Sequence, residues 1–177
     1  LGGTSTPSIG SILYAVEVPP SGGDTLFASQ IAAYEALSAG LKATLEGLNA
    51  VHSSEREYSS QGQSAQKRGS MVVAEADGLL GEAVHPVVKV HPETGRKLLY
   101  ISELTTTHIE GLREKESNAL LQMLVQHIDW KELHCRFYWE QDSIAVWDNR
   151  CTVHYAVGDY DEPREMHRVT VTGTRLR

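Results

Sequence analysis

Strand-like segments crowd the last third of this chain, and they constrain its fold more than any other feature. Runs of alternating or β-branched residues follow one another at residues 135–139, 143–147, 152–156 and 167–174. Near the start, GSILYAVEV from Gly10 to Val18 alternates in the same way and predicts a strand with one well-buried face. The pattern favours an antiparallel barrel or sandwich over a parallel α/β sheet.

Helical segments interrupt this β pattern. From Ser29 the apolar residues follow helical spacing, and a second helix is expected after Gly40. Residues 114–128 place four apolar side chains on one face of a longer amphipathic helix. We therefore expect one mainly β domain with inserted helices, which spans residues 1–177.

Three connecting segments are distinctive. Residues 19–24, PPSGGD, predict a turn, because proline fixes φ and glycine permits positive φ. Residues 85–91 and 97–101 are strand-like and flank PETG, which is typical of a hairpin. Residues 53–83 are too polar for a core and too long for an ordinary connector. We expect this last segment to be a mobile loop, which is either a lid over a site or simply disordered.

Composition excludes several classes of protein. The sequence is 41% hydrophobic and 22% charged, as in soluble domains, and its net charge of -7 argues against a nucleic-acid surface. No apolar run has the length of a membrane span, and the start shows no signal-peptide pattern. The only cysteines, Cys135 and Cys151, do not make a disulfide framework, so a cytoplasmic location is expected. Both cysteines are interpreted as small core residues.

Most of the eight histidines are dispersed along the chain. Those at strand edges and turns are expected to be structural or solvent-facing: His52, His85, His91 and His134. His127 and Asp129 form a His-x-Asp pair suited to ferrous iron. However, this pair ends the predicted helix at 114–128, where the helix dipole alone favours a histidine, so it is a weak metal candidate.

The region around His154 carries more information. His154 lies in a predicted strand, and Arg164 and Arg168 follow it across a short polar turn. Two antiparallel strands joined in this way would place a metal-binding histidine and anion-binding arginines in one cavity. The two arginines are four residues apart, so they should point to the same face of their strand. A surface hairpin held by salt bridges remains an equal alternative.

Several blocks of sequence resemble the taurine dioxygenase (TauD/TfdA-like) family of Fe(II)- and 2-oxoglutarate-dependent dioxygenases. WDNRCTVHYA and DYDEPREMHRVTVTG are similar to the family's C-terminal signature. GSILYAVEVPPSGGDTLFAS resembles the segment that follows the family's first metal motif, and HPVVKVHPETGRKLLYI and THIEGL match its middle. The blocks occur in the family's order over nearly the whole sequence.

The resemblance implies a double-stranded β-helix, a cupin-like jelly roll, which binds Fe(II) through a His-x-Asp motif and a distal histidine. In this sequence His154 corresponds to the distal histidine. Thr25 and Arg164 correspond to the residues that anchor 2-oxoglutarate, and Arg168 to the arginine that binds the anionic group of the prime substrate. Trp147, Asp148 and Asn149 match a segment that we interpret as structural.

The chain departs from the family pattern in two places. The turn between His154 and Arg164 is one residue shorter than in taurine dioxygenase itself. The family's His-x-Asp motif does not occur before Gly10, so the N-terminal part of the domain is expected to be missing from this chain.

The function implied by the resemblance is hydroxylation of a small anionic molecule: a sulfonate, an alkyl sulfate or a phenoxyalkanoate. O2 is the second cosubstrate, and 2-oxoglutarate is decarboxylated to succinate and CO2. By the same resemblance we expect a homo-oligomer with a small-molecule substrate and no nucleic-acid or membrane partner. Two alternatives remain open: an iron-free anion-binding protein of the same fold, and another cupin-like metalloprotein.

Overall fold

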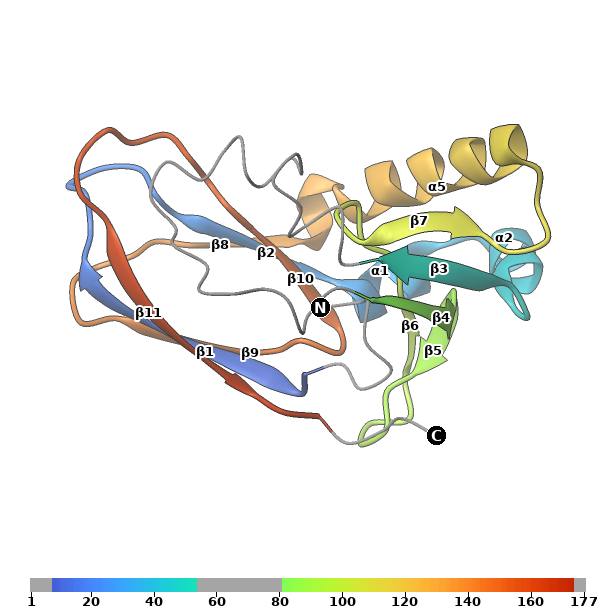
Figure 1. Ribbon diagram of the computed structural model, residues 1–177, viewed down its shortest axis with the longest axis horizontal. Coiled ribbons are helices and arrows are strands. Elements are labelled where there is room, and N and C mark those ends of the chain that lie inside the picture. The colour runs from blue at the N-terminus through green and yellow to red at the C-terminus, as the bar shows by residue number, and fades with distance from the viewer. Residues whose placement is uncertain (1–7, 54–80, 174–177) are drawn as a thin grey trace.

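The computed structural model describes residues 8–53 and 81–173 of the chain (Figure 1). The strands are β1 Gly10–Glu17, β2 Thr25–Ser29, β3 Asn49–Ser53, β4 Glu82–Pro86, β5 Val88–Val90, β6 Lys97–Leu99, β7 Thr106–Ile109, β8 His134–Phe137, β9 Ile144–Asp148, β10 Thr152–Ala156 and β11 Glu165–Val171. The helices are α1 Gln30–Ala36, α2 Ala39–Leu45 and α5 Glu114–Ile128, with a short 3-10 helix at Lys131–Leu133. Within these ranges, no helix is both long and apolar enough to cross a membrane.

Two antiparallel sheets form the β part of the structure. One has the strand order β11-β1-β9 and the other β10-β2-β8. The chain passes from one sheet to the other at each step from β8 to β11, which is the path of a jelly roll. The predicted fold class is therefore confirmed. The two sheets enclose an apolar cluster of Ala15, Trp139, Ala145 and Trp147.

A second layer of structure packs at one end of the two sheets. It contains the sheet β4-β3-β7, the hairpin β5-β6 and the helices, with α5 lying over β7 (Figure 1). The predicted helix at 114–128 is confirmed. It buries Ser117, Leu121, Leu124 and Ile128, which recur at helical spacing. Its first turn is fixed by the Glu116 carboxylate, which accepts the backbone N–H of Arg113 at 3.0 Å.

The middle of the chain differs from the sequence-based expectation. The predicted hairpin is shorter: β5 pairs with β6, but residues 82–86 form β4 and pair with β3 instead. The two ends of the predicted 53–83 loop also belong to this ladder, because Ser53 pairs with Glu82 and His52 with Ala83. The rest of that predicted loop, residues 54–80, lies outside the described residues. Only the tertiary structure reveals this pairing, because it joins segments far apart in the sequence.

Candidate active site

His154 lies in β10, opposite Phe27 of β2. Its ring is flanked by two aromatic side chains, with centroid distances of 4.9 Å to Trp147 and 6.1 Å to Phe27. His154 is exposed at the surface, but the crowding of protein atoms around its imidazole lowers its pKa to about 4, and the charge of Arg168 adds to the shift. The imidazole is therefore neutral at neutral pH, which is the form that ligates a metal.

Thr25 lies on the same face of this sheet as His154. It pairs with Ala156, two residues beyond His154 along β10, so the two side chains are diagonal neighbours. Thr25 is only 2% exposed, and its hydroxyl oxygen accepts the indole N–H of Trp139 at 3.0 Å. Because indole only donates, the hydroxyl keeps its own proton for another acceptor.

Arg164 lies just before β11, where its Nε donates to the carbonyl of Gly23 at 3.1 Å. Its guanidinium carbon is 5.8 Å from the Tyr160 ring centroid. Nη2 of Arg164 is buried and has no hydrogen-bond partner within the described parts of the chain. A buried charged donor without a partner is costly. It therefore marks a place where an anionic group fits.

Two glycines allow Arg164 to reach this position. Gly23 has a φ of 70°, and a Cβ there would be 3.1 Å from Cδ of Arg164 and 3.2 Å from its Nε. Gly22 has a φ of 80°, and a Cβ would be 2.6 Å from the carbonyl oxygen of Asp159. Asp159 also accepts the N–H of Gly23 at 2.8 Å. The turn predicted at 19–24 is therefore also the wall against which Arg164 packs.

Arg168 lies in β11, opposite Leu13 of β1. Its Nη2 donates to the hydroxyl of Ser11 at 3.0 Å, and its guanidinium carbon is 5.4 Å from the Trp147 ring centroid. Trp147 is in turn the neighbour of His154. The Trp147 indole therefore lies beside both His154, the candidate metal ligand, and Arg168, the candidate anion-binding residue. In the sequence a turn separates His154 from Arg168.

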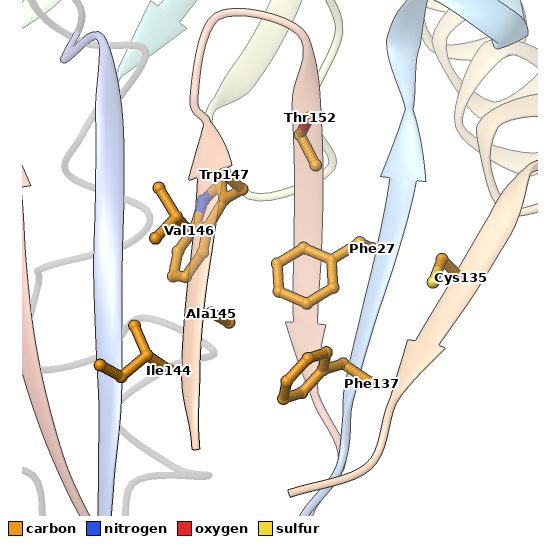
Figure 2. Close-up of a pocket in the computed structure, with 8 residues that line it drawn as sticks. All are labelled: Phe27, Cys135, Phe137, Ile144, Ala145, Val146, Trp147 and Thr152. Carbon is orange, nitrogen blue, oxygen red and sulfur yellow. The ribbon is translucent and has the colours of Figure 1, made fainter. Parts of the chain in front are cut away.

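A cavity of about 390 Å³ is lined by residues of both sheets (Figure 2). Phe27 and Trp147, which flank the His154 ring, also line this cavity. The remaining lining residues are Cys135, Phe137, Ile144, Ala145, Val146 and Thr152. Cys135 is exposed, so its interpretation as a core residue is wrong, whereas Cys151 is partly buried and packs against the core cluster of Ile31, Leu98 and Tyr100. Cys135 lies in β8, whose residues are all exposed or partly buried, and it lines the cavity together with Phe137 of the same strand.

The other histidines have structural partners. His127 lies in the last turn of α5 and contacts the carbonyl of Ala33 at 2.8 Å, while Asp129 is 81% exposed and lies 3.5 Å from His134. The weak His-x-Asp candidate therefore does not form a metal centre with His154. His52, His85 and His91 are buried rather than solvent-facing, with exposures of 1%, 8% and 4%.

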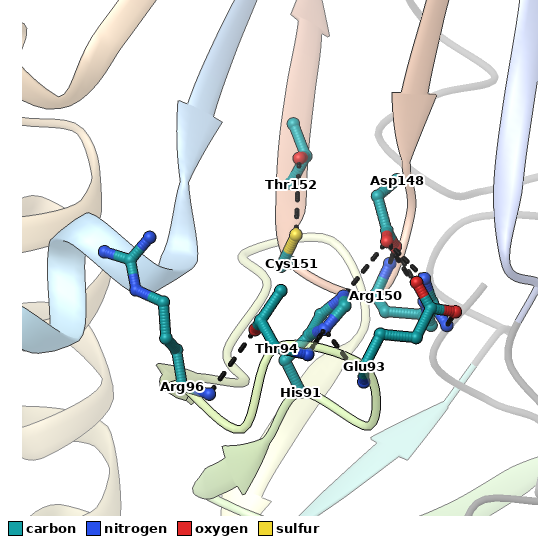
Figure 3. Close-up of polar contacts among 8 residues, drawn as sticks. All are labelled: His91, Glu93, Thr94, Arg96, Asp148, Arg150, Cys151 and Thr152. Atoms are coloured by element: carbon teal, nitrogen blue, oxygen red, sulfur yellow. Dashed lines mark hydrogen bonds and ion pairs between the residues drawn. The ribbon is translucent and has the colours of Figure 1, made fainter.

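One cluster has the composition of a metal site but not its chemistry. His91, Asp148 and Cys151 bring ligand atoms within 4.8 Å of one another (Figure 3). However, Nδ1 of His91 accepts the N–H of Thr94 at 3.2 Å, so Nε2 carries the hydrogen and donates to Asp148 at 3.0 Å. Burial raises the pKa of the Cys151 thiol, which disfavours the thiolate that metals bind.

Arg150 completes this cluster as an ion-pair junction. Its Nε donates to both carboxylate oxygens of Asp148, at 2.9 and 3.1 Å, and its Nη1 to Glu93 at 2.9 Å. Burial alone would raise the pKa of Asp148, but hydrogen bonds from Arg150 and His91 lower it to about 2. The junction ties the turn between β9 and β10 to the turn between β5 and β6.

Sequence reasoning brought Thr25, His154, Arg164 and Arg168 to notice, but it missed the residues that hold them. Trp139, Gly23 and Ser11 each contact one of those side chains. Ser11 left no clear signal, because it shares its face of GSILYAVEV with Glu17 as well as with Leu13 and Ala15. Trp139 and Gly23 left none either, and the partners of all three residues are more than 100 positions away in the sequence.

Comparisons with known proteins identify the family of this chain. The family model of the taurine catabolism dioxygenases, TauD, TfdA family, matches residues 2–170. The chain is 38% identical, over 92% of its length, to an alpha-ketoglutarate-dependent sulfate ester dioxygenase of Pseudomonas putida. It is also 38% identical, over 90% of its length, to the alpha-ketoglutarate-dependent 2,4-dichlorophenoxyacetate dioxygenase of Cupriavidus pinatubonensis.

A solved structure shows the same relationship in three dimensions. The crystal structure of a taurine dioxygenase from Burkholderia xenovorans superposes with a TM-score of 0.80 at 37% identity, and the match covers 97% of this chain and 54% of that one. This chain also covers 54% of each of the two curated relatives, so it spans about half the length of the relatives it matches. The family model, the sequence identities and the shared fold together place this chain in the TauD, TfdA family of dioxygenases.

Proposed function

We propose that the full-length protein is an Fe(II)- and 2-oxoglutarate-dependent dioxygenase that hydroxylates a small anionic organic molecule. The observation that carries this proposal is a pair of unused donors, one on Arg164 and one on Thr25, the diagonal neighbour of His154. Arg164 has a buried guanidinium nitrogen without a partner in the described ranges, and Thr25 has a hydroxyl proton that Trp139 does not use. A carboxylate offers two oxygens for two such donors, and the far carboxylate of 2-oxoglutarate fits this requirement.

His154 supports the metal part of the proposal. It would hold Fe(II) as one ligand of a facial set, since its low pKa keeps a lone pair free at neutral pH. Bound Fe(II), with 2-oxoglutarate and O2, would supply the oxidising chemistry in which the cosubstrate becomes succinate and CO2. The chain itself orients the imidazole between Phe27 and Trp147.

Arg168 supports an anionic prime substrate. Its guanidinium lies over the ring of Trp147. Its charge also helps to lower the pKa of His154, which lies beside the same ring. An anion bound there would place the rest of a small molecule near the candidate metal ligand and the apolar cavity of Figure 2. Sulfonates, alkyl sulfates and phenoxyalkanoates combine an anionic group with an apolar or short carbon body in this way.

The test is turnover by the full-length protein. The purified protein would be incubated with Fe(II), 2-oxoglutarate and O2, and succinate release would be compared with taurine, hexyl sulfate and 2,4-dichlorophenoxyacetate. We expect at least one of the three to accelerate succinate release and to be consumed in equal amount. Binding of 2-oxoglutarate without succinate release under any of these conditions would instead favour an iron-free anion-binding protein.

A further inference from the structure

Ser11 occupies the middle of the sheet β11-β1-β9, on the face that points toward the other sheet. It is fully buried and pairs with Trp147 on one side and with Thr170 on the other. Ser11 is thus a buried hydroxyl between the strand that carries Trp147 and the strand that carries Arg168. A hydroxyl in such a place requires hydrogen-bond partners.

The Ser11 hydroxyl is fully used by its neighbours. Its oxygen accepts Nη2 of Arg168 at 3.0 Å and Nδ2 of Asn149 at 2.8 Å, and it lies 3.4 Å from the hydroxyl of Thr170. A serine hydroxyl has two lone pairs and one hydrogen. Because the two amino groups fill the lone pairs, the hydrogen points toward Thr170. The orientation of every group around Ser11 is therefore determined.

Asn149 is itself held in place from two directions. Its backbone N–H donates to the carbonyl of Ile9 at 2.9 Å, and its Nδ2 also donates to the hydroxyl of Ser8 at 2.8 Å. Asn149 therefore fixes the side of Ser11 that faces away from Arg168. Ser8 contacts the same amide as Ser11, but the structure gives it no hydrogen bond to Arg168 within the described residues.

We propose that Ser11, supported by Asn149, is a positioning residue for Arg168 and thereby sets where the anionic group of the substrate binds. This inference rests on the proposed function of Arg168. An arginine side chain has several freely rotating bonds, and an exposed one loses considerable entropy when a ligand immobilises it. The guanidinium lies over the Trp147 ring, and among the described residues the bond to Ser11 is the one hydrogen bond that restrains its rotation. The guanidinium N–H groups of Arg168 that do not bind Ser11 are thus already oriented before the anion binds.

Ser11→Ala and Ser8→Ala form a matched pair for the test. Both remove a buried hydroxyl that accepts from Asn149, but only Ser11→Ala removes the acceptor of Arg168. Ser11→Thr, which keeps a hydroxyl, serves as the conservative variant. The first measurement, in the full-length protein, is the rate of guanidinium rotation of Arg168 by nitrogen NMR. We expect faster rotation in Ser11→Ala alone, with Ser11→Thr and Ser8→Ala resembling the parent protein.

The second measurement is the affinity for hexyl sulfate and taurine, by calorimetry without O2 on protein loaded with Fe(II) and 2-oxoglutarate. We expect Ser11→Ala to weaken binding of the anion roughly tenfold and Ser8→Ala less than twofold, as for the loss of one hydrogen bond to a charged group. The affinity for 2-oxoglutarate should stay the same in both variants.

The outcomes separate this inference from the proposed function. Equal rotation rates in Ser11→Ala and Ser8→Ala would overturn the positioning role, whichever molecule is the substrate. Equal losses of anion affinity in the two variants would overturn its consequence for the substrate. If neither anion bound the parent protein, the proposed substrate class would be wrong, and the NMR comparison would still decide whether Ser11 holds Arg168.

Discussion

Trp139 and Thr25 are joined by a buried hydrogen bond, in which the indole N–H donates to the hydroxyl oxygen at 3.0 Å. The bond connects the strand-like segment after β8 to the first residue of β2 and leaves the Thr25 proton free to meet an anion. Gly23, two residues before Thr25, holds Arg164. Residues 23–25 therefore contact both Arg164 and Trp139.

The two arginines should have separable roles. In the full-length protein, Arg164→Ala should raise the Michaelis constant for 2-oxoglutarate by about two powers of ten, as expected for loss of a buried charge-assisted contact, and should leave that of the anionic substrate nearly unchanged. Arg168→Ala should do the reverse. Steady-state kinetics with each substrate varied in turn measures both effects. Equal impairment of both substrates by both variants would contradict this division.

The bond between Trp139 and Thr25 should be visible in stability. Trp139→Phe removes an N–H that has a partner and leaves the Thr25 oxygen without its donor, so we expect a loss of about 1–2 kcal/mol of unfolding free energy. Trp147→Phe is the comparison, because the Trp147 N–H has no partner in the described parts of the chain. Urea denaturation of both variants measures the difference. A larger loss for Trp147→Phe would show that ring packing outweighs the hydrogen bond.

Stability should fall when the pH is lowered from about 6.5 to about 4. The pKa of His154 is lowered to about 4 and that of His52 to about 3, mainly because protein atoms crowd both rings, whereas an unfolded histidine titrates near 6.5. Within this window the unfolded chain binds more protons than the folded chain, so protonation favours unfolding. His154→Gln should therefore reduce the slope of stability against pH. Thermal unfolding at a series of pH values tests this, and an unchanged slope would remove His154 as a contributor.

The ion-pair junction of Figure 3 should contribute to stability far more than a surface pair. The Arg150 side chain is 10% exposed and binds Asp148 and Glu93, whereas that of Arg96 is 55% exposed and binds only Glu35 among the described residues. Arg150→Ala should cost about 2–3 kcal/mol, because it leaves a partly buried carboxylate without its partner. Arg96→Ala should cost less than about 1 kcal/mol. Chemical denaturation of the two variants would show the contrast, and similar losses would contradict it.

The 177-residue chain by itself should bind Fe(II) weakly. His154 is the only residue in this sequence that corresponds to the family's metal ligands. In the other candidate cluster, His91 already accepts a backbone N–H and contacts Asp148, and Asp148 also accepts from Arg150. Anaerobic titration with ferrous ions, followed by calorimetry, measures the affinity. Cys151→Ala should not change the result. Tight binding that this variant abolished would mean that the cluster of Figure 3 is a metal site after all.

Local pattern was sufficient for part of this structure. Alternating apolar residues predicted β1, helical spacing predicted α5 at its observed bounds, and the motif blocks singled out Thr25, His154, Arg164 and Arg168. These inferences succeed because burial of one face imposes a period of two in a strand and of 3.6 in a helix. The motif blocks succeed for a different reason, because they fix the order in which the site residues occur along the chain.

The tertiary structure alone decided which groups meet. β3 and β4 pair across residues 54–80, Ser11 and Asn149 meet Arg168, and Trp139 meets Thr25. No periodicity encodes such contacts, because the pairing partner of each strand depends on how the sheets and helices pack together in the folded chain. The sequence by itself determined the type of each element and the residues with chemistry to offer. Packing determined their positions, because only burial in the folded chain forces each polar group to find one particular partner.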